Sequence, residues 1–274
     1  MSGHREGNSM LSKSDNSNII KRVYQSLKCS VIAQQFAAAE RLNIEILAED
    51  LRVSITPVRE TLLRLVAEGL IINVPKMGFF MRTLSEADIR DLYEMNYILT
   101  TWSMDRLIRD EVPGLVLGMP ELVALNKKLA LAKLPSDEII ANASGAIFEY
   151  CARRSGNLEI VERVKNMNDR LNHTRVCESQ MEQAPVEALL EITKQGVEGN
   201  YKGLQKLFDD QYQRSVMLLP HVMRQRILPV VALVEETLVN TCLSKSGLVL
   251  NKELNQELNQ ELRVEPRLPQ VNVN

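Results

Sequence analysis

The chain has 274 residues, of which 45% are hydrophobic and 25% are charged, and its formal net charge is -2. This balance is typical of soluble globular proteins, and it excludes both disorder throughout the chain and a protein that coats nucleic acid with its whole surface. The length is sufficient for two domains. The four cysteines are widely spaced and form no CxxC pair, so the sequence indicates neither a zinc ribbon nor a disulfide framework.

Charge is distributed unevenly along the chain. Residues 1–83 hold 11 Lys and Arg against 8 Asp and Glu, a balance of +3, which leaves -5 for residues 84–274. The positive excess of the first part suits contact with phosphate. The polar start lacks the apolar core of a signal peptide, and no run of about 18 uncharged apolar residues follows it. A cytoplasmic location without membrane association is therefore expected.

The chain begins with a polar segment, residues 1–18, that is expected to be disordered. Val23, Leu27 and Val31 then recur at helical spacing, which predicts a helix over about residues 19–35. This helix is expected to pack on the segment that follows it.

The segment over residues 42–78 is the most informative, because it predicts two short helices joined by a tight turn. The apolar residues of their buried faces recur at three- and four-residue intervals: Ile46, Leu47 and Leu51 in the first helix, and Val58, Leu62 and Leu65 in the second. Arg52 and Val53 make the turn. Ser54 is expected to cap the second helix by accepting an amide hydrogen bond, with Pro57 in its first turn.

Two strands are expected after the second helix, which Gly69 closes. They cover residues 70–74 and 79–81 and are joined through residues 75–78. Two helices and a turn followed by such a hairpin predict a winged helix-turn-helix domain over residues 19–83.

The geometry of such a domain selects the candidates for contact with DNA. A recognition helix presents its N-terminal residues to base edges in the major groove, which indicates Thr56 and Arg59. Arg59 can bind guanine in a bidentate manner, whereas Lys76 in the wing and Arg52 in the turn would contact phosphates. The same pattern also suits a small packing unit in which Arg59 is merely solvated.

The rest of the chain shows helical patterns and no convincing alternating strand. Ser85 and Asp88 are expected to cap a long helix that runs to about Asp110. Residues 84–240 are predicted to form an all-α bundle of six or seven helices, and residues 241–274 a low-complexity tail with a leucine repeat over residues 250–262. Breaks between helices are expected near Pro120, Pro135, Gly156-Asn157, Pro185, Gly199-Asn200 and Pro220. The expected fold is mainly α, with an N-terminal winged helix-turn-helix that carries a small β-hairpin wing and a C-terminal all-α helical bundle.

Residues 40–85 resemble the DNA-binding domain of the GntR family. The match consists of Leu47-Ala48, Ser54, Thr56-Pro57-Val58-Arg59-Glu60, Leu62, Leu65, Glu68-Gly69-Leu70 and Lys76-Met77-Gly78. The resemblance implies a transcriptional regulator that binds a double-stranded DNA operator through Arg52, Ser54, Thr56, Arg59, Lys76 and Gly78. The chain departs from the family pattern at Ile55 and Glu45, where relatives often have DNA-contacting arginines.

The helical part is similar to the FCD domain of the FadR subfamily, which dimerises and binds a small effector. This resemblance rests on residues 89–94 and on Phe148 with residues 155–158. Such domains commonly hold a divalent metal through a D-x-x-F-H stretch and two later histidines. Here that stretch falls on residues 145–149, with Gly145 in place of the aspartate and Glu149 in place of the histidine. The later histidines fall on Leu189 and Gln211, and an arginine common on the first helix falls on Asn96.

No metal and no cofactor is therefore expected, and the nearest polar candidates for an effector pocket are Tyr93, Asn96 and Glu149. No catalytic residue is predicted, because the chain holds no GxGxxG, P-loop, HExxH or GxSxG motif. The sequence favours a homodimeric regulator of transcription whose helical domain can bind a small-molecule effector. Two alternatives stay open. One is a ligand-independent architectural or interaction protein with an eroded pocket. The other is an enzyme, although the sequence contains no catalytic motif that supports it.

Overall fold

The computed structural model describes residues 7–109, 120–131, 135–181 and 185–246. Contacts divide the chain into a larger unit, residues 1–225, and a second unit that begins at Arg226. The packing described below belongs to the larger unit. Among the described helices, none has the length and apolar character needed to cross a membrane.

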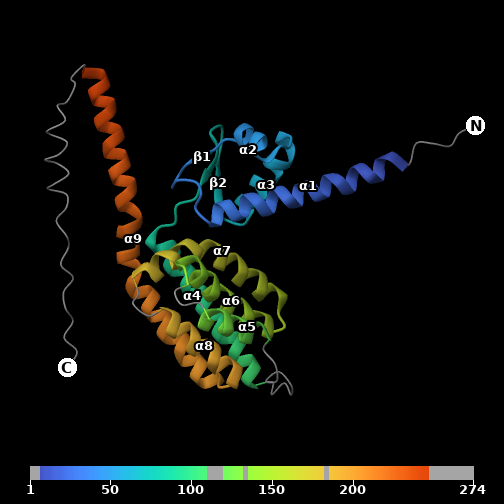
Figure 1. The fold of residues 1–274 in the computed structure, drawn as a ribbon, viewed down its shortest axis with the longest axis vertical. Coiled ribbons are helices and arrows are strands. Elements are labelled where there is room, and N and C mark those ends of the chain that lie inside the picture. The colour runs from blue at the N-terminus through green and yellow to red at the C-terminus, as the bar shows by residue number, and fades with distance from the viewer. Residues whose placement is uncertain (1–6, 110–119, 132–134, 182–184, 247–274) are drawn as a thin grey trace, which may run out of the picture. The chain divides into compact units, whose positions relative to one another are not determined.

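The first part of the chain forms three helices and a small antiparallel sheet (Figure 1). Its elements are α1 (Gly7–Ile32), β1 (Arg41–Leu42), α2 (Ile44–Leu51), α3 (Ile55–Ala67), β2 (Ile71–Val74) and β3 (Gly78–Met81). The strand order is β1-β3-β2. Ile71 lies opposite Met81, and Val74 lies opposite Gly78. These elements confirm the predicted winged helix-turn-helix and add β1, which the sequence analysis did not predict.

Helix α1 is longer at its start than the sequence pattern predicted. It begins at Gly7, so the disorder expected for residues 1–18 does not hold for residues 7–18, and residues 1–6 lie outside the described residues. Extending a formed helix costs much less than nucleating one, which allows a polar segment to continue it. The helix ends at Ile32, before the expected Gln35, and Gln34 adopts a left-handed backbone with φ +53°.

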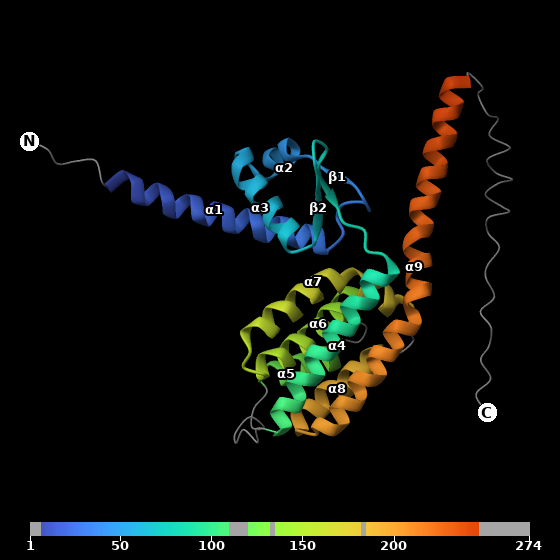
Figure 2. The same ribbon diagram turned by 180° about the vertical axis from the view of Figure 1, so that it is seen from behind.

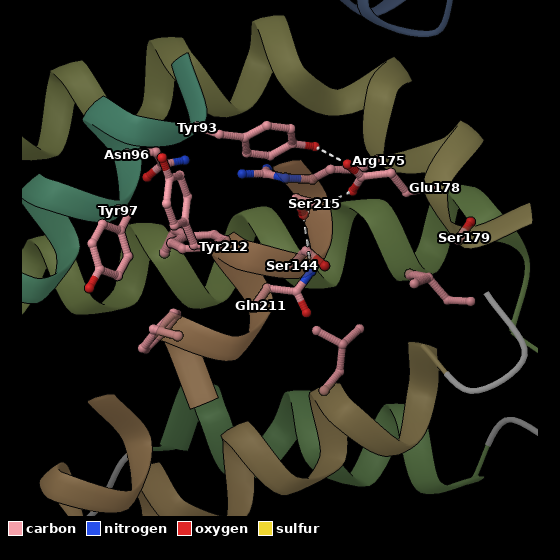
Figure 3. Close-up of a pocket in the computed structure, with 14 residues that line it drawn as sticks. Tyr93, Asn96, Tyr97, Ser144, Arg175, Glu178, Ser179, Gln211, Tyr212 and Ser215 are labelled. Carbon is pink, nitrogen blue, oxygen red and sulfur yellow. Dashed lines mark hydrogen bonds between the residues drawn. The ribbon is translucent and has the colours of Figure 1, made fainter. Parts of the chain in front are cut away.

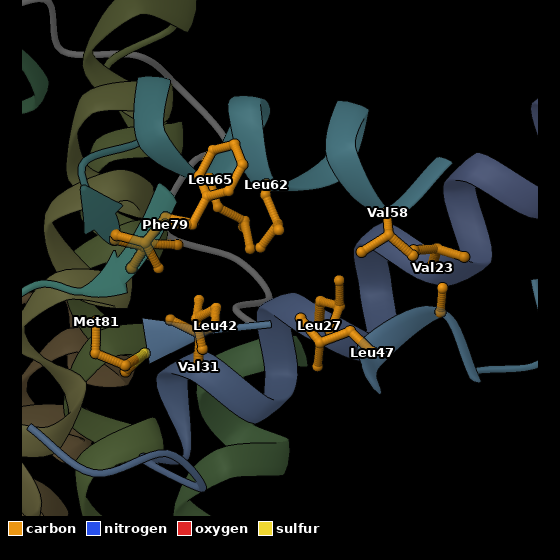
Figure 4. Packing of buried hydrophobic residues seen from close by; sticks show 13 residues of the cluster. Val23, Leu27, Val31, Leu42, Leu47, Val58, Leu62, Leu65, Phe79 and Met81 are labelled. Carbon is orange, nitrogen blue, oxygen red and sulfur yellow. The ribbon is translucent and has the colours of Figure 1, made fainter. Parts of the chain in front are cut away.

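The core of the winged domain is built from α1, α2, α3 and the sheet (Figure 4). Val58 and Leu65 of α3 are fully buried, and Leu27 of α1 and Phe79 of β3 belong to the same cluster. Gly69 ends α3 as predicted, with φ +72° and a hydrogen bond from the Leu70 amide to the Leu65 carbonyl. The helix-turn-helix is therefore held by apolar packing on one face of α3.

The second part consists of helices only, among the residues that the structure describes (Figures 1 and 2). They are α4 (Glu86–Arg109), α5 (Pro120–Leu131), α6 (Asp137–Arg154), α7 (Leu158–Met181), α8 (Pro185–Glu198) and α9 (Tyr201–Ser246). Ser85 and Asp88 form the predicted cap of α4: the Ser85 hydroxyl accepts from the Asp88 amide, and the Asp88 carboxylate accepts from the Ser85 amide. The predicted all-α bundle is confirmed.

Most of the predicted breaks lie between these helices, but the break at Pro220 does not exist. Gly156 and Gly199, with φ +68° and +70°, follow α6 and α8, whereas α9 continues through Pro220. A proline removes one helical hydrogen bond, and here Leu219 and Val222 are fully buried on either side of it, which holds the helix in place. The helix continues to Ser246, past the expected start of the tail, and the leucine repeat lies outside the described residues.

The helical bundle has two apolar clusters that meet at one aromatic side chain. One cluster includes Ile147 of α6 and Phe208 of α9, and the other includes Ile160 and Val164 of α7. Phe148 packs against both clusters, and the centre of its ring lies 5.2 Å from the centre of the Phe208 ring. Helices α4, α6 and α7 lie side by side in both views (Figures 1 and 2).

The packing of α3 generates a prediction about stability. Leu62 is 1% exposed in the core, whereas its neighbour Leu63 is 49% exposed. Leu62→Ala should lower the free energy of unfolding by about 2–5 kcal/mol, because it leaves a cavity in the core. The matched variant Leu63→Ala should change it by no more than about 0.5 kcal/mol. Urea unfolding followed by circular dichroism measures both changes, and equal effects would contradict the assigned face of α3.

Candidate nucleic-acid interface and helical-domain pocket

The buried face of α3 determines which side chains its other face presents. Val58, Leu62 and Leu65 point into the core, which leaves Thr56 and Arg59 exposed, three residues apart. Ile55 at the first turn is 45% exposed and occupies the position where the resemblance implies an arginine. The N-terminal end of α3 thus carries a hydroxyl and a guanidinium that are open to a partner.

The turn before α3 differs in one detail from the sequence expectation. Arg52 ends α2 in a left-handed conformation with φ +53°, as a tight turn requires. Ser54 occupies the N-cap position of α3, but its side chain makes no capping hydrogen bond. The predicted capping role of Ser54 is therefore wrong; an exposed hydroxyl gains little from such a bond, because water competes for it. The preceding helix, α2, does have a side-chain cap: Asn43 Oδ1 accepts hydrogen bonds from the amides of Glu45 and Ile46 at 2.9 and 3.2 Å.

The wing carries a basic residue at its tip. Lys76 is exposed and has φ +66°, and Gly78 follows with φ +102°, a conformation that strongly favours glycine. The guanidinium Nε of Arg41 lies 3.7 Å from the place where a side-chain carbon on Gly78 would stand. Arg41 is thus a second exposed basic residue of the wing. The sequence analysis did not single it out, because the two-residue strand β1 has no periodicity of its own.

One ion pair joins the winged domain to the helical bundle. The Lys28 ammonium of α1 lies 2.8 Å from Glu68 Oε2 at the end of α3 and 2.7 Å from Asp169 Oδ2 of α7. Burial alone would lower the pKa of Lys28, but its hydrogen bonds to Asp169 and Glu68 outweigh burial and raise it. Asn166 of α7 also donates to the Glu68 carbonyl at 2.7 Å. The C-terminal end of α3 therefore contacts the bundle through polar groups.

The bundle holds a pocket lined by α4, α6, α7, α8 and α9 (Figure 3). Two of the three side chains proposed from the sequence, Tyr93 and Asn96, line it. Glu149 does not: its carboxylate pairs with Arg153 at 2.6 Å one helical turn away. Leu189 and Gln211, which fall where the resemblance implies histidines, also line the pocket.

A hydrogen-bonded series of polar groups follows one wall of the pocket (Figure 3). The Tyr93 hydroxyl donates to Glu178 Oε1 at 2.8 Å, and the Ser215 hydroxyl lies 3.4 Å from Glu178 Oε2. Burial raises the pKa of Tyr93 well above its usual value, and the charge of Glu178 adds to this effect. Glu178 and its neighbour Arg175 were missed by the sequence analysis, because no pattern reveals the burial of single charged residues.

Arg175 is the buried cation of this pocket. Its Nη2 donates to Asn168 Oδ1 at 3.0 Å, and the same oxygen accepts from Asn96 at 3.1 Å. Asn168 in turn donates to the Gly145 carbonyl at 2.8 Å. Among the described residues, no three His, Cys, Asp or Glu side chains gather in a way that could hold a metal ion.

Residues 19–81 match the family model of the bacterial regulatory proteins of the gntR family. The Nta operon transcriptional regulator of Aminobacter aminovorans is 30% identical over 166 residues, which cover 59% of this chain and 76% of that protein. The gluconate operon transcriptional repressor of Bacillus subtilis (strain 168) is 26% identical over 106 residues, 39% of this chain and 43% of that protein.

Solved structures show the same fold. A putative transcriptional regulator GntR from Rhodococcus sp. RHA1 aligns with a TM-score of 0.60 at 19% identity, over 74% of this chain and 97% of that chain. E. coli McbR/YncC aligns with a TM-score of 0.58 at 20% identity, with the same coverage. The winged domain and these matches define a DNA-binding regulator of transcription. The chain belongs to the gntR family of bacterial regulatory proteins.

Tyr97 at the edge of the pocket generates a prediction about pH. Its hydroxyl donates to Asp209, and this hydrogen bond, together with burial, raises its pKa from the usual 10.0 to about 12. The folded state therefore holds this proton more tightly than the unfolded state, so stability falls as pH rises from about 10 to about 12. Tyr97→Phe should make this fall smaller, as measured by urea unfolding at several pH values. An unchanged fall would show that Tyr97 ionises normally.

Proposed function

We propose that this chain regulates transcription as a homodimer that binds a two-fold symmetric operator through α3 and the wing, under the control of an effector in the helical pocket. The observation that carries the proposal is the exposure of Thr56 and Arg59 on the face of α3 opposite its fully buried residues. A helix presented in this way fits the major groove of B-form DNA.

The side chains of the surface divide into two roles. Arg59 reads a base, because its planar guanidinium can bind O6 and N7 of guanine together. Phosphates are contacted by Lys76 and Arg41 of the wing and by Arg52 of the turn. The DNA strands that carry these phosphates are also approached by Ser54 and by the backbone at Gly78. Phosphate contacts set the register of the protein on DNA and add affinity for any sequence.

A dimer is supported by an apolar stripe on α4. Met95, Ile98 and Trp102 are 50%, 48% and 40% exposed, and their spacing places them on one face of the helix. The opposite side of α4 packs inside the bundle, as the buried Asn96 and Thr100 indicate. An exposed apolar stripe of this kind suits an isologous contact between two copies. Two winged domains are also needed, because one domain contacts too few base pairs for genomic specificity.

The helical part supplies the effector pocket, as in the FadR subfamily that it resembles. An effector acts only if it binds one arrangement of the two winged domains more tightly than another. The ion pair of Lys28 with Glu68 and Asp169 is a contact through which the bundle can bias that arrangement. A pocket with buried polar groups favours this function over a ligand-independent architectural role. The gluconate operon relative is named a repressor, and a dimer seated on a promoter would repress in the same way.

The role of Arg59 can be tested on a DNA site that the parent protein enriches from random sequences. Arg59→Ala should lower the preference for that site over a scrambled duplex by about 1–3 kcal/mol, because the contact with guanine is lost. Fluorescence anisotropy at fixed salt measures both affinities. If the variant kept the full preference, Arg59 would not read a base.

Two controls separate base readout from charge. Arg59→Lys keeps the charge and should bind scrambled DNA as the parent does while losing preference for the site. Lys76→Ala should weaken binding to both duplexes and lower the slope of log K against log salt by about one unit. An Arg59→Lys variant that retained the preference of the parent would show that the planar, bidentate guanidinium is not required for base readout.

The dimer can be tested by light scattering after size-exclusion chromatography. The parent should have twice the 31.0 kDa mass of one chain. Ile98→Lys should shift the protein toward the monomer, because the charge would be buried at the contact. Leu131→Lys is the matched control, since Leu131 is 82% exposed on α5, and it should stay dimeric. A monomeric parent would contradict the proposal.

A further inference from the structure

We propose that Ile55 is a second base-reading residue of α3 and selects the methyl group of a thymine close to the guanine that Arg59 contacts. This inference rests on the proposed operator binding and names a feature of the operator sequence. It starts from an apolar side chain at the first position of the helix. Ile55 is 45% exposed, and Ser54 and Thr56 on either side of it are exposed as well.

Packing in the core does not account for an isoleucine at this place. Among the residues before it, Ile44 and Val53 pack against the core of the winged domain. Pro57 and Val58, which follow it, are buried. Helix propensity does not favour Ile55 either, because a β-branched side chain loses rotamer freedom in a helix. The side chain is therefore available for a contact outside the domain.

The position of Ile55 places it beside Arg59 at the end of α3 that a major groove would receive. Single exposed apolar side chains are common on proteins, but this one lies where a recognition helix meets base edges. Residues four apart are neighbours on a helix surface, with about 5–6 Å between their Cβ atoms. Because successive base pairs are about 3.4 Å apart, Ile55 and Arg59 should reach base pairs no more than about two steps apart.

The chemistry of the Ile55 side chain selects the base. An isoleucine neither donates nor accepts a hydrogen bond, so polar base edges beneath it would lose water and gain no partner. Thymine differs from the other bases, because its C5 methyl group is an apolar group in the major groove. Contact of this methyl group with Ile55 removes apolar surface of both partners from water. Thymine is therefore the base that suits Ile55.

Thr56 is the other residue at this end of α3 with an exposed methyl group. It lies three residues from Arg59 and so shares a face of the helix with it. The Thr56 hydroxyl can also donate or accept a hydrogen bond, which suits a base edge or a phosphate. Ile55 has no such alternative, because apolar contact is the one favourable interaction that its side chain can make. The thymine methyl group is assigned to Ile55 for this reason.

The test uses the DNA site that the full-length parent enriches from random sequences. That site should hold an A·T pair within about two base pairs of the guanine whose preference is lost in Arg59→Ala. Replacing the thymine of this pair with deoxyuridine removes the methyl group and keeps the base pairing. Binding of the parent, measured by fluorescence anisotropy at fixed salt, should weaken about fourfold for one such replacement, as expected for the burial of one methyl group.

Variants connect this discrimination to Ile55. Ile55→Ala should reduce the difference between the thymine and deoxyuridine sites to less than about twofold, because the shorter side chain withdraws from the methyl group. Since Ile55 is exposed, the melting temperature should stay that of the parent.

Two control variants should keep the difference shown by the parent. Thr56→Ser removes the other exposed methyl group at this end of α3 and retains the hydroxyl. Leu63→Ala shortens an apolar side chain of similar exposure, 49%, that lies about two turns further along the same helix. A difference that persisted in Ile55→Ala, or that was lost in either control, would overturn the assignment to Ile55. Equal binding of the parent to both sites, or an enriched site without such an A·T pair, would show that no thymine methyl group is read.

The same measurements separate this inference from the proposed function. If the parent enriches a site whose guanine depends on Arg59 but tolerates deoxyuridine, the operator function stands and the role of Ile55 is wrong. If no sequence is enriched, the operator function itself fails, and the inference fails with it.

Discussion

The burial of one face of α3 is the constraint on which the DNA-binding surface depends. Val58, Leu62 and Leu65 fill the core between α1, α2 and the sheet, so α3 cannot rotate without exposing them. The orientation of Arg59 is a consequence of this packing, and no polar contact is needed to hold it outward.

The interior of the helical bundle differs from the core of the winged domain, because it contains charged side chains. Arg175 and Glu178 are both buried; the guanidinium donates to Asn168, and the carboxylate accepts from Tyr93. Such groups are expensive to bury and contribute little to stability. Both side chains line the pocket, and Arg175 Nη1 has no hydrogen-bond partner among the described residues.

Most of the winged domain could be predicted from local signals, namely the helical spacing of the buried residues of α3 and Gly69 after that helix. The start of α4 could be predicted in the same way from the cap formed by Ser85 and Asp88. The prediction of Ile46 on the buried face of the first helix was wrong, because Ile46 is 57% exposed. The sequence analysis missed β1, which exists only through its pairing with β3, a contact between segments far apart in the chain. The break expected at Pro220 failed, because buried neighbours outweigh a local preference. Glu149 was proposed for the pocket and Arg175 was not, since the direction of a side chain in a bundle depends on how the helices pack.

The proposed contact of Arg59 with guanine in the major groove can be examined at single guanines by methylation interference. Methylation of guanine N7 removes one acceptor of the bidentate contact. We predict that, for the parent protein on its selected site, methylation of one guanine in each half-site blocks binding, and that Arg59→Ala no longer responds to methylation of these guanines. A variant that remained sensitive at the same guanines as the parent would show that another residue reads them and would contradict the account.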